Sequence, residues 1–191
     1  MKIALGQINP TVGDFSGNAR KIIDFSRQAQ GSGAHLVLFP ELSVCGYPPR
    51  DLVERASFVA HNRETAEHIA HETKGIAVIC GLVTPAQAET GKSVMNSAAL
   101  LQDGKIAFVQ SKMLLPTYDV FDEARYFRPG EREFLCPLRG RPMALTICED
   151  AWNDRQYWKQ RLYARDPVEE LFGAGAEMMV CINASPYSMG K

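Results

Sequence analysis

Hydrophobic residues along the chain follow two different spacings, and these predict the order of its secondary structure. Short runs that are continuously apolar, or that alternate apolar and polar residues, are typical of strands. Such runs predict single strands at 2–8, 35–39, 76–83 and 178–184, and two hairpins over 93–112 and 133–148. Apolar residues spaced three or four apart predict helices at 16–30, 51–73 and roughly 154–172.

The two hairpins decide the expected fold class. Asp103-Gly104 and a turn near Gly140 join adjacent strands, and an Asp-Gly pair between apolar runs is a strong hairpin signal. Hairpins inserted into a strand–helix alternation predict an α/β fold with a mixed sheet layered with helices. Residues 113–133 break the pattern, and a long non-periodic segment in a compact domain is usually functional.

Length and charge exclude some classes of protein but do not indicate a function. At 191 residues the chain is long enough for one domain with a full core, which we take as residues 1–191. A net charge of -1 and the absence of a basic stripe argue against nucleic acid as a partner. No apolar run approaches the ~20 residues of a membrane span. The first residues predict a strand instead of a signal peptide.

Cysteine and histidine patterns give no sign of a metal site. Five cysteines without a C-x-x-C pair favour small buried thiols in the reducing cytoplasm over structural zinc. His68 and His71 lie three apart on a predicted helix, but no acidic or cysteine partner follows at ligand spacing. We therefore expect these histidines on a solvated helix face.

Three reactive side chains lie at or just beyond the ends of predicted strands. They are Glu41, Lys112 and Cys148, and strand ends at one edge of a sheet are where α/β folds build their sites. Taken alone, each has an ordinary explanation: a solvated loop carboxylate, a solvated cation and a core thiol. Cys148 is also followed by Glu149 and Asp150, and negative neighbours raise the pKa of a thiol. A nucleophilic Cys148 would need activation by residues distant in the sequence.

The segments around these three residues carry a family resemblance. They read FPELSVCGYPPRDL (39–52), SKMLLPTYDVFDEARYF (111–127) and LTICEDAW (145–152). In residue identity and in order along the chain, they resemble the three catalytic motifs of the nitrilase or carbon–nitrogen hydrolase superfamily. Within it, the resemblance is closest to the N-terminal glutaminase domains of glutamine-dependent NAD synthetases, a branch that ALGQINPTVGDFSGN (4–18) and INASPYSMGK (182–191) also fit. The resemblance implies a nitrilase-like four-layer α-β-β-α sandwich with mixed sheets.

It also implies a mechanism for hydrolysing the side-chain amide of glutamine. Cys148 would attack the amide carbon, with Glu41 as its general base. The Lys112 ammonium would favour the thiolate and offset the acids beside the cysteine. It would also hold the oxyanion, together with the backbone N–H of Glu149. Ammonia and glutamate would leave in turn, and this step requires no metal or organic cofactor.

Further residues match positions that the family uses around its substrate. Glu123 would orient the lysine or the general base through hydrogen bonds. The Glu149 carboxylate would contact the substrate's α-ammonium, and Ser185 its amino-acid end. Three aromatic residues would line the pocket, with the last at its floor: Tyr118, Tyr47 and Trp152. Without the resemblance, the Glu123 pattern fits a solvated acid, and the aromatics fit an exposed turn or a buried helix start.

The sequence departs from a complete synthetase in two ways. It has no Ser-Gly-Gly-x-Asp-Ser phosphate loop, because GSGAH at 31–35 follows a predicted helix and lacks the aspartate and second serine. ATP, Mg²⁺ and deamido-NAD are therefore expected only for a C-terminal synthetase domain absent from this chain. The last part of the amidase domain, with a basic residue for the substrate carboxylate, is also expected beyond Lys191. We therefore expect a truncated domain.

Two other functions stay open at this point. The first is a free-standing amidase or carbamoylase of the same superfamily, acting on another small amide. The second is a non-catalytic oligomerisation or docking module that keeps the fold without turnover. Because this family typically pairs subunits, a homo-oligomer is expected in either case.

Overall fold

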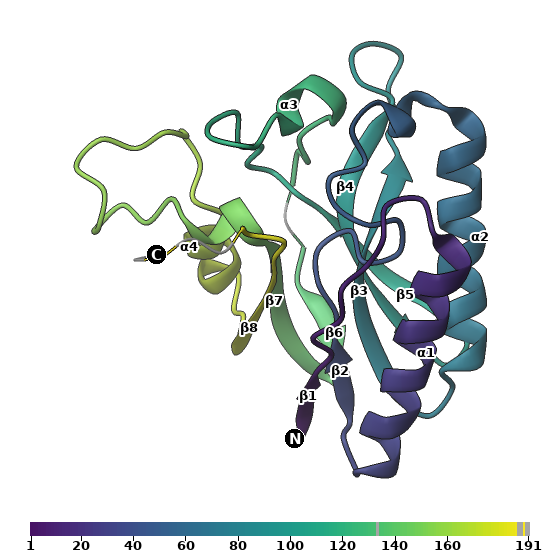
Figure 1. The fold of residues 1–191 in the computed structure, drawn as a ribbon. Helices are drawn as coiled ribbons and strands as arrows, with labels where there is room; N and C mark the ends of the chain where they lie inside the picture. Colours follow the sequence, from purple (N-terminus) through teal and green to yellow (C-terminus); the bar gives the residue numbers. More distant parts are fainter. Residues whose placement is uncertain (133, 187–188, 190–191) are drawn as a thin grey trace.

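The computed structural model describes residues 1–132, 134–186 and 189. These residues form two β-sheets that lie next to each other, with helices on both outer sides (Figure 1). The first sheet has the strand order β1-β2-β3-β4-β5. Its strands are β1 (Ile3–Leu5), β2 (Leu36–Leu38), β3 (Ala77–Pro85), β4 (Val94–Gln102) and β5 (Lys105–Ser111).

The direction of the strands brings separate strand ends together. Strands β1, β2 and β3 are parallel, and β4 is antiparallel to both β3 and β5. Strand β5 therefore runs in the same direction as β2, so both end at the same edge of the sheet. Residues that follow β2 and β5 can meet there although they are far apart in sequence.

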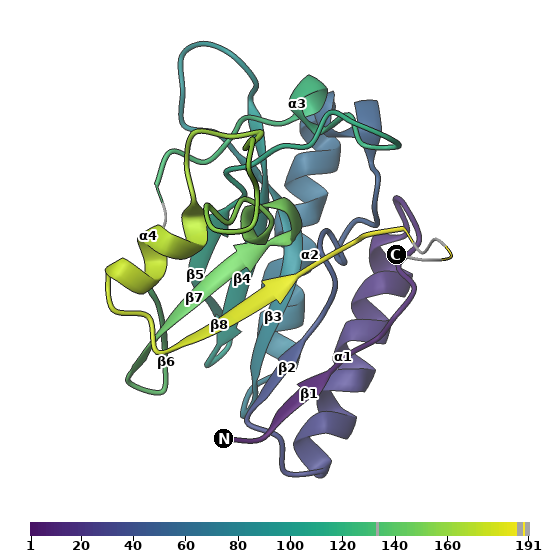
Figure 2. The same cartoon turned by 90° about the vertical axis from the view of Figure 1, so that its left-hand side faces the viewer.

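The second sheet has three described strands in the order β6-β7-β8. They are β6 (Cys136–Leu138), β7 (Arg141–Ile147) and β8 (Met178–Ile182). Strand β7 is antiparallel to β6 and parallel to β8. Figure 2 shows β7 and β8 lying across the front of the first sheet.

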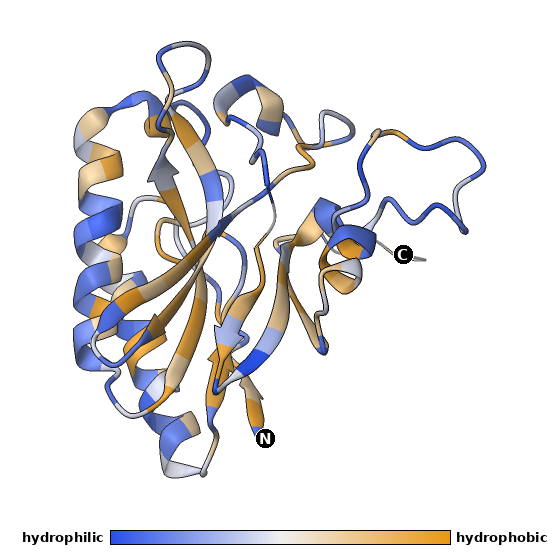
Figure 3. Cartoon of the chain, turned by 180° about the vertical axis from the view of Figure 1, so that it is seen from behind, coloured by the Kyte–Doolittle hydropathy of each residue, from blue (hydrophilic) through white to orange (hydrophobic). Residues whose placement is uncertain are grey.

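Helices cover the outer faces of both sheets and complete a four-layer α-β-β-α arrangement. Helices α1 (Phe15–Gly31) and α2 (Ala56–Glu72) lie side by side on the first sheet, with polar residues outward (Figure 3). The short α4 (Pro167–Gly173) packs against β7. Shorter helical segments lie in the connections: η1 (Arg50–Glu54), α3 (Glu123–Tyr126) and η2 (Cys148–Ala151).

Two hydrophobic clusters hold these layers together. The larger lies between the first sheet and its two helices, and includes Ile22, Ile69 and Val78. The second joins facing side chains of the two sheets: Leu36, Ile79, Leu100, Met143, Leu145 and Val180. Burial of each such aliphatic side chain contributes about 1.5–3 kcal/mol. The continuous apolar strands are therefore explained by burial on both faces.

The predicted hairpins are confirmed, with the turns where the sequence indicated. Asp103 and Gly104 have φ of 53° and 79°, and Arg139 and Gly140 have φ of 52° and 77°. Two successive positive φ values are typical of the tight turns whose twist matches that of paired strands. The mixed-sheet prediction and the four-layer sandwich are also confirmed.

Two helix predictions need correction. The stretch predicted as a helix at roughly 154–172 forms turns and bends before α4, which begins only at Pro167. Proline is tolerated in the first turn of a helix but disrupts its interior. Asp166 caps α4, because its side chain accepts a hydrogen bond from the Glu169 N–H at 3.1 Å. The helix predicted at 51–73 is interrupted by Arg55, whose backbone is extended, so η1 ends before it and α2 begins after it.

Other expectations can be compared with the described residues. Cys80 and Cys136 are buried as predicted, whereas Cys181 is only partly buried. His68 and His71 are exposed on α2, and no group of metal-binding residues occurs in the described ranges. None of the described helices is long and apolar enough to span a membrane. Four residues of the motif at 182–191, including Lys191, lie outside the described residues.

Candidate active site

Glu41 is fixed by a tight turn that lies directly on strand β3. It follows β2 and Pro40, and the next residue, Leu42, has a positive φ of 50°. A Cβ at Gly81 would lie 2.0 Å from the Leu42 nitrogen, so only glycine allows the turn to approach this strand. The Gly81 N–H also donates to the Pro40 carbonyl at 3.3 Å. The side chain of Glu41 is therefore held at the end of the first sheet and is 1% exposed.

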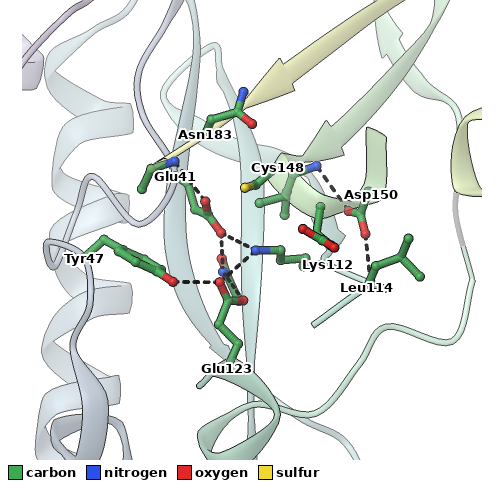
Figure 4. A network of polar contacts seen from close by, with 12 residues as sticks. Glu41, Tyr47, Lys112, Leu114, Glu123, Cys148, Asp150 and Asn183 are labelled. Carbon is green, nitrogen blue, oxygen red and sulfur yellow. Dashed lines mark hydrogen bonds and ion pairs between the residues drawn. The ribbon is translucent and has the colours of Figure 1, made fainter. Parts of the chain in front are cut away.

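Lys112 follows β5 and its side chain is completely buried against two carboxylates. Its Nζ lies 2.7 Å from Glu41 Oε1 and 2.8 Å from Glu123 Oε1 (Figure 4). Its backbone N–H donates to the Asn96 carbonyl at 2.8 Å. One ammonium thus faces two carboxylates, and the cluster carries a net negative charge when all three groups are ionised. Burial of these charges is tolerated because they are paired and hydrogen-bonded.

Asn96 and Tyr47 complete the hydrogen bonds of the two glutamates. Asn96 Nδ2 donates to Glu41 Oε1 at 2.7 Å and to Glu123 Oε2 at 3.2 Å. The Tyr47 hydroxyl donates to Glu123 Oε1 at 2.9 Å. Glu123 therefore lies inside the cluster, where it contacts Lys112 directly. Sequence reasoning did not identify Asn96; its only signal was a polar residue within the apolar β4 strand.

Cys148 lies at the junction of β7 and η2 in an unusual backbone conformation. Its φ is 48°, a left-handed value that costs a non-glycine residue about 1–3 kcal/mol and that clusters at functional sites. Its side chain is buried, and Sγ lies 3.7 Å from Ser185 Oγ. Figure 4 shows the sulfur on the side that faces the cluster of Glu41 and Lys112.

The electrostatics of this cluster leave the resting thiol protonated. The pKa of Cys148 is raised to about 11, first by burial and then by Glu41, although Lys112 lowers it. Burial alone lowers the pKa of Lys112, but Glu41 and Glu123 raise it well above its usual value. The lysine therefore stays cationic. It does not lower the pKa of Cys148 to the extent predicted from the sequence, because Glu41 and Glu123 already neutralise its charge. Thiolate formation needs a base at the moment of attack.

Glu149 does not direct its carboxylate at the thiol. Its two oxygens accept from the hydroxyls of Tyr118, at 2.7 Å, and Tyr163, at 3.1 Å. The pKa of each phenol is raised, first by burial and then by the nearby carboxylate, so both remain hydrogen-bond donors. Tyr163 lies in the segment wrongly predicted as helix, and no sequence signal singled it out.

Asp150 was predicted only as an unfavourable neighbour of the cysteine. Its side chain is fully buried, and it accepts N–H bonds from Met113 at 3.0 Å, Leu114 at 2.8 Å and Ile147 at 3.1 Å. The carboxylate is thus occupied by backbone donors, and its adjacency to Cys148 in sequence gave no hint of these partners.

Hollows lined by described residues lie beside the cluster, and two of them contain predicted substrate-binding residues. A cleft of about 850 Å³ is lined by Glu41, Tyr47 and Ser185 among others. A smaller hollow of about 320 Å³ is lined by Tyr118, Glu149, Trp152 and Tyr163. Trp152, predicted at the floor of the pocket, is 54% exposed and forms part of this second hollow.

A buried glutamate–lysine pair beside a cysteine brings a base, a cation and a nucleophile together, which is the set that covalent catalysis uses. Residues 2–177 match the family described as carbon-nitrogen hydrolase, so the chain belongs to this family of enzymes. The family resemblance of the three motifs is thereby confirmed.

Its similar proteins include glutamine-dependent NAD(+) synthetases. The enzyme of that name from Synechocystis sp. is 44% identical and covers 99% of this chain, and the one from Thermotoga maritima is 38% identical and covers 100%. The chain spans 35% and 31% of the length of these two curated relatives.

Solved structures agree on the fold. Glutamine-dependent NAD+ synthetase from Acinetobacter baumannii, in complex with ADP, has a TM-score of 0.83 and 34% identity, covering 98% of this chain and 33% of that one. A mutant amidase from Nesterenkonia sp. AN1, with the acetamide moiety of fluoroacetamide added at its active-site cysteine, has a TM-score of 0.78 and 25% identity. That match covers 99% of this chain and 67% of the amidase.

Proposed function

We propose that this chain hydrolyses the side-chain amide of glutamine through a Cys148 thioester, and that its ammonia feeds ATP-dependent NAD synthesis in a larger protein. The observation that carries the proposal is the buried pair of Glu41 Oε1 and Lys112 Nζ, 2.7 Å apart, beside the Cys148 thiol. A base and an oxyanion donor are thereby held next to one nucleophile, which is what acyl transfer requires.

In the first step Glu41 takes the thiol proton as the sulfur attacks the amide carbon. The raised pKa of Cys148, caused first by burial, means that free thiolate is scarce, so proton transfer accompanies attack. The C–S bond forms while the C=O π electrons move onto oxygen. Glu41 stays aligned because Asn96, Lys112 and the Ala184 N–H all donate to it.

The oxyanion is stabilised by Lys112 and by the start of η2. An ammonium has three N–H donors, and Lys112 gives two of them to Glu41 and Glu123. The third is available for the oxyanion. The Glu149 N–H lies in the first turn of η2, where N–H groups lack intrahelical partners. Each such donor contributes roughly 3 kcal/mol to lowering the barrier.

Collapse of the tetrahedral intermediate breaks the C–N bond, and Glu41 returns its proton to the departing ammonia. A water molecule then attacks the thioester while Glu41 accepts one of its protons. The C–S bond breaks to release glutamate, and Glu41 gives its proton to the departing sulfur, which regenerates the thiol. The protein contributes side chains and the Glu149 backbone N–H to these steps, and water is the second nucleophile.

Recognition of an amino-acid substrate is assigned to Glu149 and its neighbours. Its buried carboxylate, fixed by Tyr118 and Tyr163, suits the α-ammonium of glutamine. Ser185, 3.7 Å from the Cys148 sulfur, is assigned to the amino-acid end, and Trp152 to the aromatic wall. The proposal leaves ATP, Mg²⁺ and deamido-NAD to a C-terminal synthetase domain, and it is supported by relatives named NAD(+) synthetases, of whose length this chain spans 35% and 31%. Cytoplasmic location and a homo-oligomer are part of the same proposal.

The experiment is incubation of the full chain with glutamine and with its diazo-ketone analogue, followed by mass spectrometry. We expect an adduct on Cys148 that is absent from Cys148→Ser, and ammonia release that needs Cys148. An unlabelled Cys148, or turnover that survives Cys148→Ala, would reject the mechanism.

A second candidate is a small-amide amidase, favoured by the likeness to the Nesterenkonia amidase. Faster turnover of acetamide or propionamide than of glutamine selects this alternative. Absence of any adduct or turnover selects the non-catalytic docking module instead.

A further inference from the structure

Asp150 is a buried carboxylate to which the proposed mechanism gives no role. It has no exposed surface, and none of the ion pairs within the described residues includes it. Its partners are three backbone N–H groups. A carboxylate placed in this way needs an explanation, because a buried charge without a cationic partner is expensive to maintain.

The three donors belong to two segments that carry reactive side chains. Met113 and Leu114 directly follow Lys112, and both donate to Asp150 Oδ1, at 3.0 and 2.8 Å. Ile147 directly precedes Cys148, and its N–H donates to Oδ2 at 3.1 Å. Figure 4 shows Asp150 between Leu114 and the Cys148 turn. One side chain therefore connects the backbone of the first sheet to the backbone of the second.

We propose that Asp150 is a positioning residue that fixes the Lys112 ammonium relative to the Cys148 sulfur. The inference rests on the proposed function, because this spacing places the nucleophile beside the oxyanion donor. Asp150 touches neither the substrate nor the reacting atoms, and it acts through the two backbone segments that it joins.

Elsewhere the two segments meet through the Tyr118 hydroxyl, which donates to Glu149 at 2.7 Å, and through the packing of Ile147 and Cys148 in the core between the sheets. Neither contact involves the backbone that directly follows Lys112. The Lys112 backbone is fastened on its own side by bonds with Asn96 and Gly130, both at 2.8 Å, and these do not reach the cysteine. Cys148 holds a left-handed φ of 48° at the start of η2, a helical segment of only four residues. The Asp150–Ile147 bond closes this turn from within. Without Asp150, the turn and the lysine would relax separately.

The chemistry of the side chain agrees with this role. Burial raises the pKa of Asp150 to about 7, although the N–H donors and Lys112 lower it. The N–H donors therefore stabilise a carboxylate at a site where burial disfavours the charge. An asparagine at this position would avoid the charge. An amide at this position has one acceptor oxygen, so its NH₂ group would oppose the Ile147 N–H.

The test uses the full chain and two substitutions, Asp150→Asn and Asp150→Ala. The control is Asp14→Ala, which removes another carboxylate that accepts a backbone N–H, from Gly17 at 2.9 Å, at the start of α1. Circular dichroism and thermal melting compare folding. Asp150→Asn keeps the volume and one acceptor, so it stays informative if Asp150→Ala does not fold.

The decisive readout is the ratio of alkylation rates of Cys148 by iodoacetate and by iodoacetamide, localised by mass spectrometry. Because both reagents attack the same thiolate, the ratio reports the local charge and is independent of glutamine turnover. Displacement of Lys112 lowers the preference for the anionic reagent, whereas loss of the Asp150 charge alone raises it. The two explanations therefore predict opposite signs.

We expect the ratio to fall by about threefold in Asp150→Asn and more in Asp150→Ala, with no change in Asp14→Ala. The kcat for glutamine should fall by at least about tenfold while KM changes by less than about twofold. A ratio that stays constant or rises in both Asp150 variants overturns the positioning role. Wild-type chain that fails to hydrolyse glutamine counts against the proposed function, and the alkylation ratio still decides the role of Asp150.

Discussion

Glu41 and Lys112 form an ion pair of 2.7 Å whose side chains are 1% and 0% exposed, although 71 residues separate them in sequence. The pair exists because β2 and β5 run in the same direction and end at the same edge of one sheet. Glu123 contacts the same ammonium from the long connection that follows. The predictions below follow from this buried arrangement of charges.

Replacing Lys112 removes both the oxyanion donor and the cation that two buried carboxylates share. Lys112→Met should lower kcat about 10²- to 10³-fold. It should also lower the free energy of unfolding by roughly 3–5 kcal/mol, because Glu41 and Glu123 lose their partner. Steady-state kinetics and urea unfolding measure the two effects. The matched control is Lys105→Met, an exposed lysine at the opposite end of β5. Equal losses in both variants would contradict the assignment.

Neutralising Glu123 should separate thiol reactivity from turnover. Burial first raises the pKa of Cys148, and Glu123 adds to this increase, so Glu123→Gln should lower that pKa. We expect alkylation by iodoacetamide at pH 8 to become about threefold faster, whereas kcat falls about tenfold as Lys112 loses its orientation. Glu131→Gln, an exposed residue of the same connection, is the control. Slower alkylation in Glu123→Gln would refute this prediction.

Glu149 should decide selectivity for an amino-acid substrate. Glu149→Gln should raise the KM for glutamine by about tenfold or more, since a charged hydrogen bond contributes roughly 1.5–3 kcal/mol. The comparison substrate is the glutamine analogue that lacks the α-amino group. Its kcat/KM should be nearly the same in wild type and variant. Glu177→Gln, whose side chain is 51% exposed, is the control. An equal loss for both substrates would remove Glu149 from substrate recognition.

Gly81 should not tolerate even one added methyl group. The Cβ of Gly81→Ala would meet Leu42 N at 2.0 Å and Glu41 backbone atoms at 2.7 and 2.8 Å, none of which belongs to a flexible side chain. We expect unfolding to become easier by about 1–3 kcal/mol and turnover to fall as Glu41 shifts. Gly173→Ala at the end of α4, where nothing lies within 4 Å, is the control. Unchanged activity in Gly81→Ala would show that the turn adapts.

Asp150 should make stability depend on pH in the acid range. Its folded-state pKa is raised to about 7, mainly by burial, whereas an unfolded aspartate titrates near about 3.9. Between these values the native state binds a proton that the unfolded state has lost, so stability falls as pH rises. The slope from this group is at most about 1.4 kcal/mol per pH unit. Urea unfolding at pH 5 and pH 7.5 should show this dependence reduced in Asp150→Asn. If the unfolding free energies of wild type and Asp150→Asn changed equally with pH, this prediction would be contradicted.

Local sequence patterns were sufficient for most of the secondary structure. Both hairpins were predicted because Asp103-Gly104 and Gly140 supply the positive φ that tight turns need. The strands were predicted from runs that are continuously apolar, as in the buried β3, or that alternate apolar and polar residues, as in the half-exposed β5. The predicted helix at 154–172 was wrong in its extent, because a proline is tolerated in the first turn of a helix but disrupts its interior, so no single helix crosses Pro167. Apolar spacing alone does not include this restriction.

Contiguous segments of the sequence predicted the order of strands and helices and the family, and singled out Glu41, Lys112 and Cys148 as candidates, because motifs and periodicity are local properties. Tertiary structure decided what surrounds them. Asn96 and Tyr163 reach the site from a strand interior and an irregular segment, without a local signal. The balance of charges around the thiol depends on distances between separate elements. Two carboxylates share Lys112, and Cys148 stays protonated. This balance depends on how the two sheets pack, so it could not be predicted from the sequence.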